Sequence, residues 1–201
     1  LGLKGIPASA EETMVLRDVL LAEELDAPIH IAHVSTRKSV DIIREAKKRG
    51  VKVTCEVTPH HISLSEDIIE YDYTDCKVNP PLRTKDDIQA LKQALKDGTI
   101  DIIATDHAPH AALDKTQDFY KSANGISNIE ASFSICNTEL VLGGILTLKE
   151  LVCKMSYNPS KLLGINAGKI EIGMPADITL IDIEKMVTWK KLFWRGGLYY
   201  M

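Results

Sequence analysis

Two side chains that can bind a metal ion each follow a short apolar run in this sequence. His33 comes directly after the run at 29–32, and Asp106 comes directly after the run at 100–105. Imidazole nitrogen and carboxylate oxygen both suit zinc, and a catalytic zinc keeps one position open for water. Two ligands alone make a poor zinc site, and an isolated histidine after a strand is commonly a hydrogen-bonded core residue. The pair therefore indicates part of a metal site.

Asp106 belongs to a segment that concentrates polar chemistry. Residues 106–110 read Asp-His-Ala-Pro-His, which places three ionisable or metal-binding groups directly after an apolar run. Burying such groups without a function would cost several kcal/mol. We therefore predict a functional role for Asp106.

Four other histidines have structural interpretations. His60 and His61 end another β-like run and are interpreted as residues that support a nearby site. We expect His107 to turn into the scaffold. We expect His30 to pack in the core.

These residues require a scaffold that brings the ends of several strands together. Helices and strands alternate along the first half of the chain, which is typical of βαβ units with a parallel sheet. In such sheets the active site lies at the carboxyl ends of the strands. Apolar and β-branched runs predict strands at 29–34, 51–57 and 100–105, and capping patterns with helical spacing predict helices at 9–26, 39–48 and 84–98.

The predicted elements of the second half are fewer. Thr147 with Glu150 forms a capping pattern, and Asn158 before Pro159 indicates a second helix start. Residues 173–183 predict a tight turn into a strand. The aromatic-rich tail at 187–201 has no assigned structure.

Four motifs in a fixed order resemble those of class I dihydroorotases in the amidohydrolase superfamily. The similarity continues at Gly173-Met174-Pro175-Ala176-Asp177 and so covers nearly the whole chain up to about residue 185. The four motifs are Ala32-His33-Val34-Ser35-Thr36, Glu56-Val57-Thr58-Pro59-His60-His61, Lys77-Val78-Asn79-Pro80-Pro81-Leu82-Arg83 and Ala104-Thr105-Asp106-His107-Ala108-Pro109-His110.

The resemblance implies a fold and its division. It implies an α/β chain that forms part of a (β/α)8 TIM barrel, with strands six to eight and their helices. Residues 1–170 would be the C-terminal part of this barrel. Residues 171–201 would return towards a small β-domain and end in an atypical tail.

The resemblance also implies a reaction and roles for individual residues. Such enzymes use one or two zinc ions to convert dihydroorotate reversibly to N-carbamoyl-L-aspartate in pyrimidine biosynthesis. His33 and Asp106 would bind metal, and Asp106 would also carry the proton of the attacking water to the leaving ring nitrogen. Asn79, His110 and Gly125 would bind the substrate, although a turn role for Asn79 and a plain loop role for Gly125 remain open.

Several features of the family are absent from this sequence. The first-strand His-x-His, the arginine after it, the fourth-strand bridging residue and the fifth-strand histidine would all precede Leu1. We therefore expect a fragment that lacks several metal ligands and is inactive or unstable alone.

Two alternative functions remain. Hydantoinases, dihydropyrimidinases and allantoinases share the barrel, the histidine and the aspartate, but generally lack counterparts of His110 and of the sequence around Asn79. A non-catalytic subunit that scaffolds aspartate transcarbamoylase is the other, but such proteins tend to lose metal ligands, and His33 and Asp106 are present here.

Composition limits the partners and the compartment. The net charge of −4 and the interleaving of basic with acidic residues argue against nucleic acid and anionic membranes as partners. No apolar run is long enough to span a bilayer. We therefore expect a cytoplasmic protein. Four widely spaced cysteines predict buried, reduced thiols, with a structural zinc or a disulfide as the alternatives. We expect a homo-oligomer, with aspartate transcarbamoylase as a further possible partner.

Overall fold

A three-stranded parallel sheet lies at the centre of the computed structural model, which describes residues 2–69, 74–115 and 118–186. The strands lie in the order β1 (Ile29–Ile31), β2 (Val53–Val57) and β3 (Ile102–Ile103). Both pairs are parallel, as the alternation of helices and strands predicts. The strands are shorter than predicted, but the ladder continues beyond them, because the Val34 and Ala104 amides donate to carbonyls of β2.

The two faces of the sheet differ in polarity. Along β2 the side chains of Val53, Cys55 and Val57 are buried, while those between them are half-buried. On the second face the His30 ring contacts the Thr54 hydroxyl at 2.8 Å and the Glu56 carboxylate at 3.1 Å. His30 is therefore structural, as predicted, but it lies among polar side chains and not in the apolar core.

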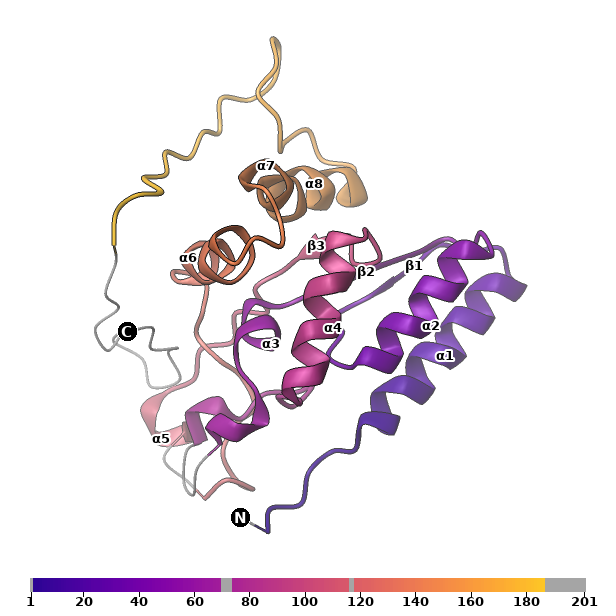
Figure 1. Cartoon of the computed structure of the whole chain (residues 1–201), viewed down its shortest axis with the longest axis vertical. Helices are drawn as coiled ribbons and strands as arrows, with labels where there is room; N and C mark the ends of the chain where they lie inside the picture. The colour runs from indigo at the N-terminus through magenta and orange to yellow at the C-terminus, as the bar shows by residue number, and fades with distance from the viewer. Residues whose placement is uncertain (1, 70–73, 116–117, 187–201) are drawn as a thin grey trace.

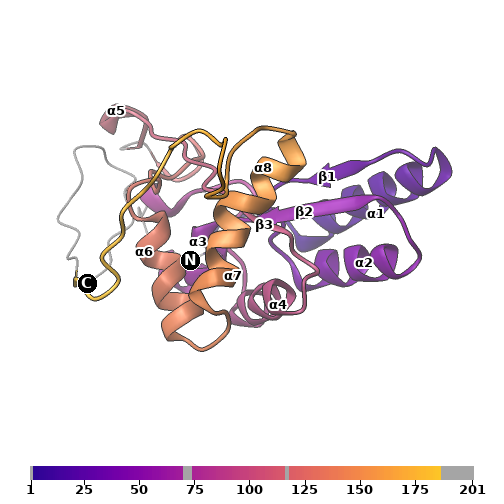
Figure 2. The same cartoon turned by 90° about the horizontal axis from the view of Figure 1, so that it is seen from above.

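Helices cover the apolar face. Figures 1 and 2 show α1, α2 and α4 side by side along the sheet, with α6 and α7 beyond α4. In chain order, the α-helices of the described residues are α1 (Ala8–Glu24), α2 (Arg37–Lys48), α3 (Pro59–Ser63), α4 (Lys85–Lys96), α5 (Ala112–Lys115), α6 (Ser132–Cys136), α7 (Leu148–Val152) and α8 (Asn158–Leu163). They are accompanied by the short 3-10 turns η1 (Glu66–Ile68) and η2 (Thr74–Cys76) and the π turns η3 (Asn137–Leu142) and η4 (Cys153–Tyr157).

One apolar core joins the sheet to these helices. Its buried members come from six α-helices, all three strands and the segments beside them, so the core fixes how the strands sit against the helices. Fully buried members include Val19, Ile43, Cys55, Val57, Leu91, Ile100, Leu140 and Leu151.

The caps predicted at Thr84 and Thr147 are correct, the helix start predicted at Ser39 is two residues late, and the cap predicted at Ser9 is wrong. Thr84 and Thr147 each form a capping box with the residue three positions later. Thr36 caps α2 by accepting from the Ser39 amide. The helix therefore begins at Arg37, two residues before the predicted start at Ser39. The Ser9 cap is wrong, because α1 already begins at Ala8 after an extended Pro7, so Ser9 lies inside the first turn.

The Asn158 helix start is also wrong. Tyr157 has helical backbone angles, so α7, η4 and α8 follow one another without a break from Leu148 to Leu163. The Asn158 side chain does not cap a helix and instead donates to the Asp101 carbonyl at 2.8 Å. Pro159 is tolerated because a π turn precedes it and relaxes the usual hydrogen-bond ladder.

The predicted strand within 173–183 does not form. A turn is present at Gly173, where φ is +88°, but the residues after it have no regular secondary structure. Ile178, Leu180 and Ile183 are exposed. No other described segment pairs with them, and an unpaired strand has no ladder to stabilise it. The tail at 187–201 lies outside the described residues.

Three of the four cysteines fit the expectation of buried, free thiols. All four cysteines are free, and Cys55, Cys76 and Cys136 are buried, whereas Cys153 is half-buried. Burial raises the pKa of these three buried thiols to about 12, so they stay protonated at neutral pH. No helix in the described ranges is long and apolar enough to cross a membrane.

The corrected helix starts predict different effects for two alanine substitutions. Thr84→Ala removes a capping box and should lower the free energy of unfolding by about 1 kcal/mol. Ser9→Ala removes a hydroxyl that caps nothing, so it should change stability by less than about 0.5 kcal/mol. Urea unfolding of both variants beside the unaltered chain measures the difference, and equal losses would contradict the observed start of α1.

Candidate functional site

His33 and Asp106 lie just beyond the carboxyl ends of β1 and β3, which places them on the same edge of the sheet. Both have left-handed backbone conformations, with φ of +38° for His33 and +47° for Asp106. In the described part of the chain, Asp26 is the only other non-glycine residue of this kind. Such a conformation costs about 1–2 kcal/mol and tends to persist where function requires it.

The exposure of Asp106 differs from the prediction. Its side chain is exposed to solvent, so the cost of burying a charge does not apply to it. The reason is that the chain turns away from the sheet after Ala104, and the left-handed Asp106 lies on this turn. His33 is half-buried. The strained backbone, and not burial, is what distinguishes Asp106.

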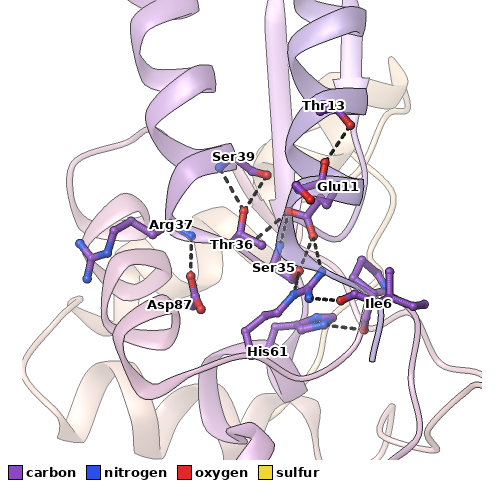
Figure 3. A network of polar contacts seen from close by, with 12 residues as sticks. Ile6, Glu11, Thr13, Ser35, Thr36, Arg37, Ser39, His61 and Asp87 are labelled. Atoms are coloured by element: carbon purple, nitrogen blue, oxygen red, sulfur yellow. Dashed lines mark hydrogen bonds and ion pairs between the residues drawn. The ribbon is translucent and has the colours of Figure 1, made fainter. Parts of the chain in front are cut away.

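A largely buried carboxylate fixes the segment that follows His33 (Figure 3). Glu11 on α1 accepts hydrogen bonds from the backbone amides of Ser35 and Thr36, at 3.0 and 3.2 Å. It also accepts from the Ser35 hydroxyl, which in turn accepts from Arg83. The sequence analysis missed this role of Glu11. Its position could have indicated the role, because Glu11 lies four residues before Val15 on the buried stripe of α1, and a carboxylate on such a stripe needs partners.

Two further side chains, Arg83 and His61, hold the turn that contains Asn79. The Arg83 guanidinium donates to the Ile6 carbonyl at 2.7 Å and lies 3.8 Å from the Glu11 carboxylate. The His61 ring lies 3.0 Å from the Pro80 carbonyl and 2.7 Å from the Thr58 hydroxyl. Because a carbonyl only accepts, Nε2 of His61 carries the proton.

The two neighbouring histidines are neutral supporting residues. Burial lowers the pKa of His61 to about 4, although the hydrogen bond to Pro80 opposes this shift. Burial also holds the pKa of His60 well below its usual value, and the nearby His61 and His33 lower it further. Both rings are at most 2% exposed. They were predicted to support the site, and their burial at the end of β2 agrees with this interpretation.

A cavity of about 280 Å³ joins two of the predicted site residues. His33 and Asn79 both line it, together with Glu11, Arg83 and apolar side chains of α1. Asp106, His110 and Gly125 are not among its lining residues. The cavity thus brings His33 and Asn79 together on one side of the site.

Gly125 and His110 meet on the other side. The His110 ring lies 2.8 Å from the Asn124 carbonyl, and the Gly125 amide donates to the Lys77 carbonyl at 2.9 Å. A Cβ on Gly125 would lie 2.6 Å from the Ala108 carbonyl and 2.7 Å from the His110 ring. With a φ of +145°, this position accepts only glycine without strain. The glycine therefore permits the close approach of the two loops.

Lys115 holds the loops around Gly125 together, and its role was not predicted from the sequence. Its side chain is 1% exposed, and its ammonium donates to the carbonyls of Thr74, Lys77 and Ala123. Burial lowers its pKa, with partial opposition from Asp75. Nothing in the local sequence marks this lysine, because its partners lie far along the chain or in a neighbouring loop.

The described residues do not complete a zinc site. A catalytic zinc takes three protein ligands, and no group of three or more His, Cys, Asp or Glu side chains placed to hold a metal occurs within 2–69, 74–115 and 118–186. His33 and Asp106 offer suitable donors, but they are two. Their roles, and those of Asn79, His110 and Gly125, stay predictions.

These elements define a class of structure, the parallel α/β sheet with candidate ligands beyond the carboxyl ends of its strands. Comparison with known sequences is more specific. The chain belongs to the Amidohydrolase family, whose sequence profile matches residues 5–196.

Its relatives include several proteins named dihydroorotase. The chain is 56% identical to the dihydroorotase of Acetivibrio thermocellus over 185 residues, which cover 92% of this chain and 43% of the relative. It is 55% identical to that of Geobacter metallireducens over 189 residues, with 94% and 44% covered. The chain thus spans less than half the length of these relatives.

Solved structures of related enzymes have the same fold. The L-hydantoinase of Arthrobacter aurescens superimposes with a TM-score of 0.79 at 31% identity, covering 85% of this chain and 39% of that one. The dihydropyrimidinase of Brevibacillus agri gives 0.80 at 30%, with the same coverage. The arrangement of sheet and helices is therefore that of the hydantoinase-like α/β fold.

Because the backbone is left-handed at His33 and Asp106, we predict that a glycine variant at either position is more stable than an alanine variant. Glycine adopts this conformation freely, whereas a Cβ costs about 1 kcal/mol or more. Asp106→Gly should therefore unfold in urea with a free energy about 1 kcal/mol higher than Asp106→Ala, and the His33 pair should behave alike. At Ala104, the control, glycine should instead be less stable than the native alanine. Equal stability of the glycine and alanine variants at both sites would contradict the strain.

Proposed function

We propose that this chain forms the sixth-, seventh- and eighth-strand part of a zinc-dependent dihydroorotase. The observation that carries the proposal is the placement of His33 and Asp106, both left-handed, beyond the carboxyl ends of two strands in one parallel sheet. Sequence identity of 50–56% to proteins named dihydroorotase supports this reaction over others of the family. The conversion is the reversible opening of the dihydroorotate ring to N-carbamoyl-L-aspartate.

In this proposal Asp106 moves a proton. Its exposed carboxylate is accessible to water and substrate, so it can accept the proton of an attacking water and deliver it to the leaving ring nitrogen. His33 and Asp106 would supply two ligands of a site for one or two zinc ions, the others coming from outside the described residues. Zinc, when bound, activates water and polarises carbonyl groups.

The substrate contacts would come from the two sides of the site. His110 would help to bind the substrate carboxylate, and Gly125 beside it would offer backbone atoms. Asn79, across the site at the cavity that it shares with His33, would hydrogen-bond the edge of the pyrimidine ring. The geometry supports this division, because each pair is held by its own set of buried polar contacts.

The proposal extends to architecture and partners. Residues 1–170 would belong to a (β/α)8 barrel and residues 171–201 would lead to a small β-domain. The exposed apolar side chains of 178–183 support this division, because a neighbouring sheet would cover them. We propose a cytoplasmic homo-oligomer, with aspartate transcarbamoylase as a possible further partner.

A hydantoinase activity is the second candidate, favoured by the structural matches. These reach TM-scores of 0.77–0.80, but at 26–31% identity. The higher identity to the dihydroorotases makes their reaction the first choice. Competition between dihydroorotate and hydantoin for the same protein separates the two activities.

The activity should depend on Asp106 and on the missing part of the barrel. In the test, this chain replaces the matching 43% of the Acetivibrio thermocellus dihydroorotase, which gives a joined protein of full length. The joined protein with zinc should open dihydroorotate in preference to hydantoin. Asp106→Ala should lower the rate by at least about 100-fold, because it removes the proton-transferring group. The exposed Asp114 serves as a matched control, and Asp114→Ala should leave the rate unchanged.

Three outcomes would contradict parts of the proposal. Preference for hydantoin would favour the second candidate. Full activity of Asp106→Ala would remove Asp106 from the mechanism. Activity of this chain alone that depends on zinc and on Asp106 would show that its own residues or its oligomer complete the site.

A further inference from the structure

The conformation of Asp106 requires support from its neighbours. Its backbone is left-handed with a φ of +47°, and its side chain is exposed. Among the described residues, no donor reaches the Asp106 carboxylate within hydrogen-bonding distance. The groups that hold this conformation must therefore act on the residues before and after it, Thr105 and His107.

Asn128 contacts both of these neighbours. Its side-chain amide donates to the Thr105 carbonyl at 2.8 Å. Its backbone amide donates to Nδ1 of His107 at 3.1 Å, and the amide of Ile129 donates to the same nitrogen at 3.2 Å. One residue, 22 positions away from Asp106 in sequence, thus binds the peptide on one side of it and the ring on the other.

Asn128 also connects this turn to the end of β2. Its side-chain amide donates a second hydrogen bond, to Nδ1 of the buried His60 ring, at 3.0 Å. Both amide hydrogens are therefore used, and Asn128 is 1% exposed. The opposite orientation of the amide would place its oxygen against the Thr105 carbonyl oxygen, which is repulsive. The contacts fix the side chain in a single orientation.

We propose that Asn128 is a positioning residue for Asp106, which it holds through Thr105, His107 and His60. The inference rests on the proposed function for its catalytic consequence, but not for its structural one. Asn128 would keep the carboxylate aimed at the mouth of the site. Without it the strained turn would relax towards a conformation with negative φ, and the carboxylate would point elsewhere.

The chain offers a matched control in Asn158. This residue donates through the same side-chain atom to the Asp101 carbonyl at 2.8 Å, at the opposite end of β3. Asn128→Asp and Asn158→Asp thus each exchange the donating nitrogen for an oxygen opposite a backbone carbonyl. Both should lower global stability, but only the first lies beside Asp106.

Amide hydrogen exchange of this whole chain is the structural test. In Asn128→Asp the amides of residues 128 and 129, which donate to His107, and of Ala108, which donates to Ile126, should exchange at least about 10-fold faster. The Ala104 amide, bonded to Val57, should keep its protection. Asn158→Asp should leave all four unchanged. If Asn128→Asp does not fold, Asn128→Ala removes the same donor without adding a charge.

Kinetics of the joined protein test the catalytic consequence. Asn128→Asp should lower kcat by about 10- to 100-fold with little change in KM, because misplacing a reacting group slows the chemical step. Asn158→Asp should change neither constant by more than about 2-fold. Equal effects of the two substitutions on exchange or on kcat would overturn the inference. If the joined protein is inactive, the proposed function fails, and the exchange rates alone decide the role of Asn128.

Discussion

Parallel pairing of β1, β2 and β3 determines where the candidate site can form. In a parallel sheet all strands point the same way, so the segments after β1, β2 and β3 leave the sheet at one edge. His33 and Asp106 occupy the first turns after the two outer strands, while His60 and His61 follow the middle one. The helices pack on the apolar face and make this pairing rigid. The placement of the candidate site residues therefore depends on the short hydrogen-bond ladder between the three strands and on the apolar core that supports it.

Buried or largely buried polar side chains from distant segments then fix the exact course of each turn. Glu11 binds the residues after His33, His61 binds the Pro80 carbonyl, and Lys115 joins the loops around Gly125. Each of these groups replaces the water that it loses on burial with backbone partners, which is the condition for burying it at all. A turn held from two or three directions can keep a strained residue such as Asp106 in place.

The sequence predicted the parts of this arrangement that depend on local pattern. The three strands, the helices between them and the caps at Thr84 and Thr147 follow from periodicity and capping chemistry. The Ser9 cap is wrong because α1 already begins at Ala8, directly after Pro7. Asn158 resembled a cap, but its side chain is bound to a distant carbonyl. The strand predicted within 173–183 does not form, because a strand needs a partner to pair with.

His60 and His61 were predicted as supporting residues, but the others could not be, because their partners are distant in sequence. Lys115 and Asn128 carry no local signal, and their importance lies in contacts with segments up to 68 positions away. The positive φ at His33 and Asp106 is equally invisible, because histidine and aspartate adopt many conformations. Resemblance to the dihydroorotases identified both residues without revealing the strain.

Anomalous diffraction at the zinc absorption edge, from crystals of the joined protein, tests the central claim most directly. The claim is that His33 and Asp106 bind the same metal site. It predicts an anomalous peak with the His33 ring nitrogen and an Asp106 carboxylate oxygen both about 2.0–2.2 Å away, or one bound to each ion of a close pair. A peak at the carboxyl ends of the strands that neither residue contacts would contradict the claim.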